Sequence, residues 1–252
     1  MTYSIALAGK GGTGKTTLAG LLIKYLAQAD MTPVLAVDAD ANSNLNEVVG
    51  LEVRETLGHA REEMKRGVSA GMTKDVFMEM KLEQAVVESE KFDLIVMGRP
   101  EGPGCYCAAN SLLTQYLERL MGNYAYVVID NEAGMEHISR LTTNDIDLLV
   151  IVSDPSKRGI QAAARIKELT KELGLDVRAH SIIINQAKEG DLGAVEKTLD
   201  LYGLDLTGIV PEDPFLRELD VQGKPLIEIT EQSPAVEAAF AIFDRLLKGK
   251  SR

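Results

Sequence analysis

The run from Gly9 to Thr16 carries residue types that can bind phosphate, at a spacing that suits this chemistry. It reads Gly-Lys-Gly-Gly-Thr-Gly-Lys-Thr and joins an apolar stretch to a stretch with helical periodicity. Glycines allow backbone N–H groups to approach phosphate oxygens closely, and the N-terminal end of the next helix adds a favourable dipole. In this context the spacing G-x-x-x-x-G-K-[ST] predicts a phosphate-binding loop.

Two side chains of this loop have expected roles of their own. Lys15 can bind the β and γ phosphates of a nucleotide, and Thr16 can offer its hydroxyl to Mg²⁺. The cofactors that follow are ATP or ADP and Mg²⁺, and the alternative is a glycine-rich turn that binds no ligand. The residues expected at the phosphates are Gly11, Gly12, Thr13, Gly14, Lys15, Thr16 and Thr17.

Acidic residues end two other apolar stretches. Asp38 and Asp40 close the second stretch, and Asp130 closes a later one. Open parallel sheets bind ligands at the carboxyl ends of their strands, so all three are candidates for the nucleotide site. Asp130 is expected beside Mg²⁺, and Asp40 is expected to orient or deprotonate the attacking water. Helix capping is the alternative role for each carboxylate.

Adenine is the favoured base. A guanine-binding loop needs a carboxylate to accept from the N–H donors of the base. At the position where such a loop would place this carboxylate, the sequence has Lys188, which carries the opposite charge. The amide of Asn185 can supply an acceptor and donors. Backbone carbonyls of Pro211, Glu212 and Asp213 can accept from an exocyclic amine, although ordinary strand-end loops would also fit this pattern.

Cys105 and Cys107 are the two cysteines of the chain, and they lie in a glycine-rich stretch. Reduced thiolates are soft ligands that suit Zn, Ni, Cu(I) or iron–sulfur. Two thiolates make half of a tetrahedral site, which a two-fold dimer would complete. The positive end of a helix expected from Asn110 to Met121 would lower the thiolate pKa. Buried structural cysteines and a reversible disulfide are the alternatives.

These residues need a scaffold that brings strand ends together. Apolar runs alternate with amphipathic stretches, which predicts an α/β fold, a doubly wound, mostly parallel sheet of seven or eight strands with helices on both faces. The expected strands are Tyr3 to Ala8, Val34 to Asp38, Phe92 to Met97, Tyr124 to Asp130, Leu148 to Val152, Ala179 to Ile184 and Gly208 to Val210. The other expected helices are Lys15 to Ala29, Lys157 to Leu173, Gly190 to Tyr202 and Pro234 to Lys248.

Residues 1–252 are expected to form a single P-loop domain, because no Pro- or Ser-rich linker interrupts the pattern. The stretch from Val53 to Glu90 is charged and helical in pattern, and we expect a helical insertion there. It contains four methionines, which suit either a core or an adaptable partner surface: Met64, Met72, Met78 and Met80.

Composition excludes several classes of protein. The 252 residues include 27 Lys plus Arg and 38 Asp plus Glu, a net charge of −11, which opposes binding to nucleic acid or to an anionic membrane. The longest apolar run, Ala238 to Phe243, is far shorter than the roughly 18 residues of a membrane span. No cationic leader opens the chain, so a cytoplasmic protein is expected.

The stretch from Lys10 to Thr16 resembles the deviant Walker A motif of the family that includes the nitrogenase iron protein and the division-site and chromosome-partitioning ATPases. The resemblance continues through Asp38-Ala39-Asp40, Asp130 to Gly134, Asn185 and Pro211 to Asp213, and spans the whole chain. It implies a homodimer in which Lys10 reaches the nucleotide of the partner subunit. Lys10, Lys15 and Asp40 would then be the catalytic residues. A solvated loop lysine is the alternative for Lys10.

Two segments, Gly98 to Cys107 and Asp130 to His137, resemble the CooC-type ATPases that insert nickel into carbon monoxide dehydrogenase. This implies an ATP-hydrolysing metallochaperone that holds Ni²⁺ or Zn²⁺ between subunits through Cys105 and Cys107, with that enzyme or acetyl-CoA synthase as client. An iron–sulfur electron-transfer protein and a positioning or partitioning ATPase are the alternatives. The nitrogenase-type cluster needs a cysteine in the second segment, which instead carries His137, either an auxiliary ligand or a solvated side chain.

Overall fold

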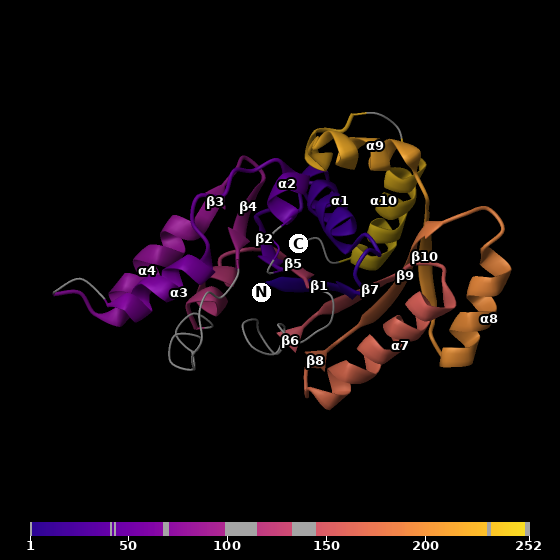
Figure 1. The fold of residues 1–252 in the computed structure, drawn as a ribbon, viewed down its shortest axis with the longest axis horizontal. Coiled ribbons are helices and arrows are strands. Elements are labelled where there is room, and N and C mark those ends of the chain that lie inside the picture. Colours follow the sequence, from indigo (N-terminus) through magenta and orange to yellow (C-terminus); the bar gives the residue numbers. More distant parts are fainter. Residues whose placement is uncertain are drawn as a thin grey trace.

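The computed structural model describes residues 2–40, 42, 44–67, 71–98, 115–132, 145–230 and 233–249. Its main sheet contains β1 Tyr3–Gly9, β2 Val34–Ala39, β3 Val86–Glu88, β4 Phe92–Val96, β5 Tyr126–Asn131, β7 Leu148–Ser153, β9 His180–Ala187 and β10 Leu206–Pro211. The strand order is β10-β9-β7-β1-β5-β2-β4-β3 (Figure 1). All pairs are parallel except β3 and β4 at the edge. A second, two-stranded sheet joins β6 Asp145–Ile146 and β8 Asp176–Val177.

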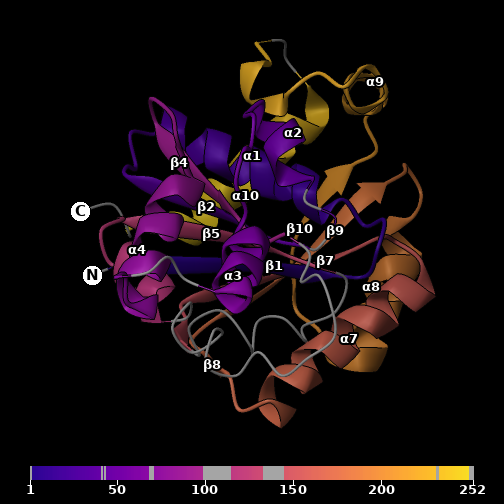
Figure 2. The same ribbon diagram turned by 60° about the vertical axis from the view of Figure 1, so that its left-hand side comes forward.

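Helices cover both faces of the main sheet (Figures 1 and 2). One face carries α1 Lys15–Gln28, α2 Leu45–Val49, α9 Pro214–Gln222, the short 3-10 helix η1 Leu226–Glu228 and α10 Pro234–Leu247. The other carries α3 Leu57–Arg66, α4 Lys74–Ala85, α7 Lys157–Glu172 and α8 Leu192–Tyr202. The chain is also helical at 115–121.

The central strands form because their sequences can be buried on both faces. Every residue of β2, β5 and β7 is buried, and these strands are rich in Val, Ile and Leu. Such continuous apolar runs are typical of parallel strands covered by helices. β1 ends at Gly9, a position where only glycine fits, because a Cβ there would lie 2.3 Å from the carbonyl oxygen of Val152 on β7.

The predicted fold class, a mostly parallel sheet with helices on both faces, is confirmed. All seven expected strands are present with small differences at their ends. The sequence interpretation placed no strand between residues 53 and 90, but Val86–Glu88 forms β3 directly after α3 and α4. Three edge residues are too few for an alternating pattern to be read. The short helices α2 and α9 were also missed.

The helix expected from Pro234 packs on the sheet as predicted. The buried residues of α10 include Ala239, Ile242, Phe243 and Leu247, which join the core around β1 and α1. Its amphipathic pattern is therefore explained by the core. Within the described ranges, no helix has both the length and the hydropathy needed to cross a bilayer.

Candidate nucleotide site

The loop between β1 and α1 is shaped by two glycines with left-handed backbones and by its own hydrogen bonds. Gly12 has φ 82° and Gly14 has φ 81°. The Thr13 hydroxyl donates to the carbonyl of Lys10 at 2.9 Å, and Lys15 Nζ donates to the same carbonyl at 3.3 Å. Gly14 begins α1 without a side-chain cap, so the first N–H groups of this helix keep their capacity to bind an anion.

Lys15 is buried in a site that also contains carboxylates. Its side chain is 7% exposed, and burial lowers its pKa, while the nearby charges of Asp130, Asp40 and Glu132 oppose this shift. The ammonium group lies where the loop turns into the helix. A phosphate bound at the helix end would therefore meet a partly desolvated cation.

Asp38 and Asp130 face each other in register on β2 and β5. Both carboxylates are fully or almost fully buried, and burial is the main cause that raises the pKa of Asp38 to about 6 and that of Asp130 to about 7. The hydrogen bond to Thr16 and the charge of Lys15 oppose the shift of Asp130, while the charges of Asp38 and Asp40 add to it. Two buried acids at one strand edge favour a cation between the sheet and the loop.

The two carboxylates differ in their hydrogen bonds. Asp38 accepts from the backbone N–H groups of Asp40 and Leu45, both at 3.0 Å, and so holds the loop that leads into α2. Asp130 accepts from Thr16, and its Oδ1 atom is buried with no hydrogen-bond partner among the described residues. Hard oxygen ligands suit Mg²⁺, so Thr16 and Asp130 fit this ion. The contacts of Asp38 match its alternative, structural role.

Asn131, which follows Asp130 on β5, is a polar residue of the site to which the sequence interpretation assigned no role of its own. It is 1% exposed, and its Nδ2 atom donates to the carbonyl of Leu7 on β1 at 2.8 Å. Its Oδ1 atom is buried without a partner among the residues described. An amide at the end of an otherwise apolar strand was the signal that could have identified it.

A cavity of about 310 Å³ lies beside the loop, between the ends of β9 and β10. It contains the residues predicted to contact the base, which come from separate parts of the chain, and its size suits a small ligand. Their contacts with a nucleotide stay predictions. The lining residues are Thr17, Asn185, Gln186, Pro211, Glu212, Asp213, Leu216, Arg217, Asp220 and Ala235.

The end of β9 also supports the phosphate loop, which sequence alone did not reveal. Asn185 Nδ2 donates to the carbonyl of Thr13 at 2.9 Å, and Gln186 Nε2 lies 3.5 Å from the carbonyl of Gly12. A Cβ on Gly14 would lie 2.3 Å from Asn185 Nδ2. One donor of Asn185 is therefore used by the loop. Gln186 adopts φ 58°, a strained conformation for a residue with a side chain.

Asp213 acts through its side chain on the scaffold of the cavity. It accepts from the N–H of Phe215 at 2.9 Å, from the Ser233 hydroxyl and from the N–H of Ala235. Burial raises its pKa, but these hydrogen bonds outweigh burial and hold the pKa below its usual value. Asp213 thus ties the start of α9 to the start of α10.

The remaining predicted residues differ in what the structure says of them. Lys10 is exposed at the tip of the loop, where a second subunit could reach it. Asp40 follows β2 and accepts from the N–H of Asn42 at 2.8 Å. Cys105, Cys107 and His137 lie outside the described residues. Within the part of the chain that is described, no group of three or more His, Cys, Asp or Glu side chains could hold a metal ion.

Comparison with known proteins agrees with this geometry. The domain family described as "CobQ/CobB/MinD/ParA nucleotide binding domain" matches residues 4–226. An uncharacterized ATP-binding protein of Methanocaldococcus jannaschii is 40% identical, over 98% of this chain and 99% of its own. The carbon monoxide dehydrogenase accessory protein CooC of Rhodospirillum rubrum is 32% identical, over 97% of this chain and 96% of its own.

Solved structures show the same fold. The MinD cell division protein of Aquifex aeolicus aligns with a TM-score of 0.71 and 25% identity, over 98% of this chain and 97% of its own. The resemblance drawn from the Walker-type motif is thereby confirmed. This protein belongs to the CobQ/CobB/MinD/ParA family of nucleotide-binding ATPases, as a member similar to CooC.

Proposed function

We propose that this protein is a Mg²⁺-dependent, dimeric ATPase that assists insertion of nickel into carbon monoxide dehydrogenase. The observation that carries the proposal is its 32% identity to CooC over nearly the full length of both chains. The phosphate loop, the base cavity and the oxygen of Asp130 that lacks a partner among the described residues support the ATPase part. Acetyl-CoA synthase, which needs the same kind of metal delivery, is the alternative client.

ATP hydrolysis would use residues at the carboxyl edge of the sheet. Lys15 and the loop N–H groups would bind the phosphates, and Thr16 and Asp130 would hold Mg²⁺, whose chemistry is to neutralise charge on the transferred phosphate. Asp40 orients the attacking water. Lys10 is exposed at the loop tip, a position that suits contact with the nucleotide of a partner subunit.

The metal cargo would be held by Cys105 and Cys107 from both subunits. This part of the proposal rests on the sequence: soft thiolates suit Ni²⁺ or Zn²⁺, and two pairs related by a two-fold axis complete four ligands. ATP binding would bring the two pairs together. Hydrolysis would separate them and release the metal to the client.

The test is metal analysis of the purified dimer with and without a non-hydrolysable ATP analogue. We expect one Ni²⁺ or Zn²⁺ per dimer, and loss of metal in Cys105→Ser and Cys107→Ser, because each substitution removes two of four ligands. Protein that binds neither metal would disprove the chaperone proposal. Visible absorption with stoichiometric iron and sulfide would support an iron–sulfur electron-transfer protein in its place.

A positioning ATPase is the second candidate, because the septum site-determining protein MinD of Bacillus subtilis is 26% identical over 88% of this chain. Such a protein would bind a surface in its ATP state. Cosedimentation with anionic vesicles in the presence of ATP separates the two candidates. ATP-dependent vesicle binding without any metal would favour positioning.

A further inference from the structure

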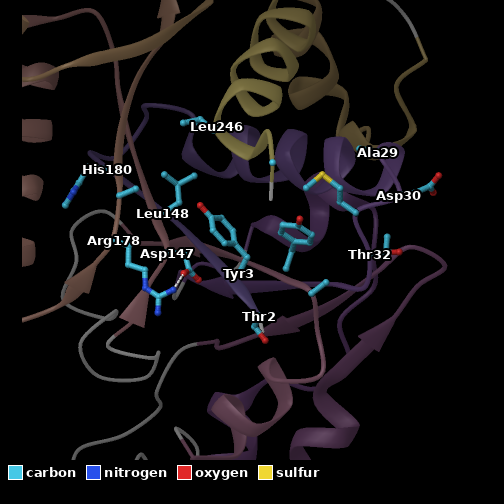
Figure 3. A pocket seen from close by; sticks show the side chains of 15 residues that line it. Thr2, Tyr3, Ala29, Asp30, Thr32, Asp147, Leu148, Arg178, His180 and Leu246 are labelled. Carbon is cyan, nitrogen blue, oxygen red and sulfur yellow. Dashed lines mark hydrogen bonds and ion pairs between the residues drawn. The ribbon is translucent and has the colours of Figure 1, made fainter. Parts of the chain in front are cut away.

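A second, larger cavity lies at the opposite edge of the sheet from the phosphate loop. Figure 3 shows the side chains that line it. Its volume is about 840 Å³, within the range of roughly 300–1,000 Å³ typical of ligand pockets. Four adjacent strands contribute their first residues to it: Tyr3 of β1, Tyr126 of β5, Leu148 of β7 and His180 of β9. Three of these strands, β1, β5 and β9, end at the nucleotide site. The cavity is therefore separate from that site.

The two carboxylates that line this cavity are already paired. Asp30 forms an ion pair with Lys91 at 2.9 Å. Asp147 accepts from the N–H of Ser4 at 2.8 Å and from its hydroxyl at 3.1 Å, and it also binds Arg178. Each acid therefore has a cationic partner, although at Tyr3 the charge of Asp147 acts more strongly than that of Arg178.

Arg178 gives one side of the cavity a fixed cationic group. The nearly buried carboxylate of Asp147 holds one guanidinium nitrogen, Nη1 (Figure 3). A guanidinium has five N–H donors, so most of them stay available for a planar anion. Burial and the charges of Lys167 and Lys171 lower the pKa of the neighbouring His180, so these lysines add positive potential at this side.

Two tyrosine rings give the cavity an aromatic wall. Tyr3 and Tyr126 pack edge to face, with ring centroids 6.1 Å apart and an interplanar angle of 63°. Burial is the main cause that raises the pKa of both phenols, so both stay protonated at neutral pH. Figure 3 shows Tyr3 beside the Arg178–Asp147 pair, with Asp30 and Thr32 farther along the rim. Ring surfaces of this kind favour flat aromatic ligands.

We propose that this cavity is a second ligand site, which binds a small aromatic anion. The ring of the ligand packs against Tyr3, which the nearly buried Tyr126 holds in place, and its carboxylate, phosphate or sulfonate group binds the donors of Arg178 that have no partner among the described residues. Arg178 is the one cationic residue among the described residues that line the cavity, so the anion of the ligand is recognised by the donors of this guanidinium and not by a general positive potential. The proposal does not depend on the proposed metallochaperone function.

Two matched fluorescent probes test the site on the full-length protein. Anilinonaphthalene sulfonate carries an aromatic scaffold and an anionic group, and phenylnaphthylamine carries nearly the same scaffold without charge. We expect saturable binding of the sulfonate at saturating Mg-ADP, which excludes the nucleotide site. Arg178→Gln should lower the affinity for the sulfonate by about tenfold and leave the affinity for phenylnaphthylamine unchanged, because the substitution removes only the charge-assisted contact.

Tyr3→Leu should weaken both probes, because both rely on the aromatic wall. Arg165→Gln is the control, since Arg165 is an exposed arginine of α7 that does not line the cavity. Circular dichroism shows whether each variant is folded. If Arg178→Gln does not fold, Arg178→Lys is tested in its place. Displacement of the sulfonate by Mg-ADP, binding that does not saturate, or equal affinity in wild type and the Arg178 variant would each overturn the proposal.

Discussion

Asp38 and Asp130 lie side by side on β2 and β5, and the difference between them comes from their hydrogen bonds. Both oxygens of Asp38 accept backbone N–H groups, whereas one oxygen of Asp130 has no partner among the described residues. A buried carboxylate without a full set of donors is costly unless a proton or a cation joins it. At the residue scale, the second acid is therefore the one suited to Mg²⁺.

Lys15→Ala and Asp40→Ala should have different effects on ATP. Lys15→Ala removes the buried cation next to the phosphates, so tight ATP binding is lost. Asp40→Ala should keep Mg-ATP binding and slow hydrolysis, because its proposed role concerns the water. Isothermal titration calorimetry and phosphate release assays measure the two properties. Equal loss of binding in both variants would show that Asp40 acts on the structure or on the metal ion.

Gln186 should combine strain with nucleotide binding. Gln186→Gly relieves a left-handed conformation that costs roughly 1–2 kcal/mol in a residue with a side chain, so the free energy of unfolding should rise. The same change removes the carboxamide near Gly12, so ADP affinity should fall several-fold. Thermal unfolding and ADP titration measure both.

Gln186→Ala is the matched control for this pair of effects. It also lacks the carboxamide but keeps the strained backbone, so it should lose ADP affinity without gaining stability. Unchanged ADP affinity in both variants would mean that the 3.5 Å contact with the loop has no role in binding.

At the element scale, the nucleotide site is held by contacts between helices far apart in the sequence. Lys24 of α1 is buried and donates to the carbonyls of Leu226, at 3.3 Å, and Ile227, at 3.0 Å. Asp213 joins α9 to α10 at the edge of the base cavity. The helix that begins at the phosphate loop is thereby fixed to the segment that joins α9 to α10.

Asp213→Asn should destabilise the protein in a pH-dependent manner. The folded pKa of Asp213 lies below its unfolded value of about 3.9, so its stabilisation is present above that pH and is lost as pH falls through the folded pKa. We expect a loss of about 1 kcal/mol in the free energy of unfolding at pH 7, because Asn can still cap the helix but lacks the negative charge that favours the starts of α9 and α10. Urea unfolding across pH measures it.

The difference between Asp213→Asn and wild type should shrink once the pH falls below about 4. Asp200→Asn, an exposed carboxylate of α8, is the control and should change stability little at any pH. A constant difference between Asp213→Asn and wild type at every pH would mean that the charge of Asp213 contributes nothing.

In the molecule as a whole, the two ends of the central strands contribute residues to different cavities. The phosphate loop, Asp38, Asp130 and the base cavity lie at one edge, and the aromatic cavity lies at the other. Nearly all the helices pack apolar side chains into one of two hydrophobic cores, one on each face of the main sheet. The loop tip with Lys10 stays exposed, which leaves the nucleotide edge open to a second subunit.

Lys10→Ala should weaken the coupling between nucleotide and metal while sparing most nucleotide binding by one subunit. If ATP raises the affinity for metal by bringing the cysteine pairs together, bound metal must raise the affinity for ATP by the same factor. Such factors are typically about 5- to 150-fold. The measurement is Ni²⁺ or Zn²⁺ affinity by competition, without nucleotide, with ADP and with a non-hydrolysable ATP analogue. Equal metal affinities in the three wild-type states would refute nucleotide-gated delivery.

The fold class, the phosphate loop and the acids at the strand ends were predictable from the sequence alone. These features depend on local patterns: apolar runs mark buried strands, and a loop that must wrap a phosphate needs glycines at fixed spacing. The sequence also identified Asn185 and Pro211 to Asp213 as a group, because parallel strands bring their carboxyl ends to one edge. Short elements such as β3 were beyond it, since they depend on the neighbours they pair with.

The different roles of these residues became visible only in the three-dimensional structure. Both oxygens of Asp38 accept from backbone N–H groups, and the carboxylate of Asp213 accepts from the starts of two helices. One oxygen of Asp130, in contrast, has no partner among the described residues. Asn185 contacts the loop because Gly14, 171 positions earlier, has no side chain. Hydrogen-bond partners and burial depend on distances between remote segments, and no local pattern in the sequence records those distances.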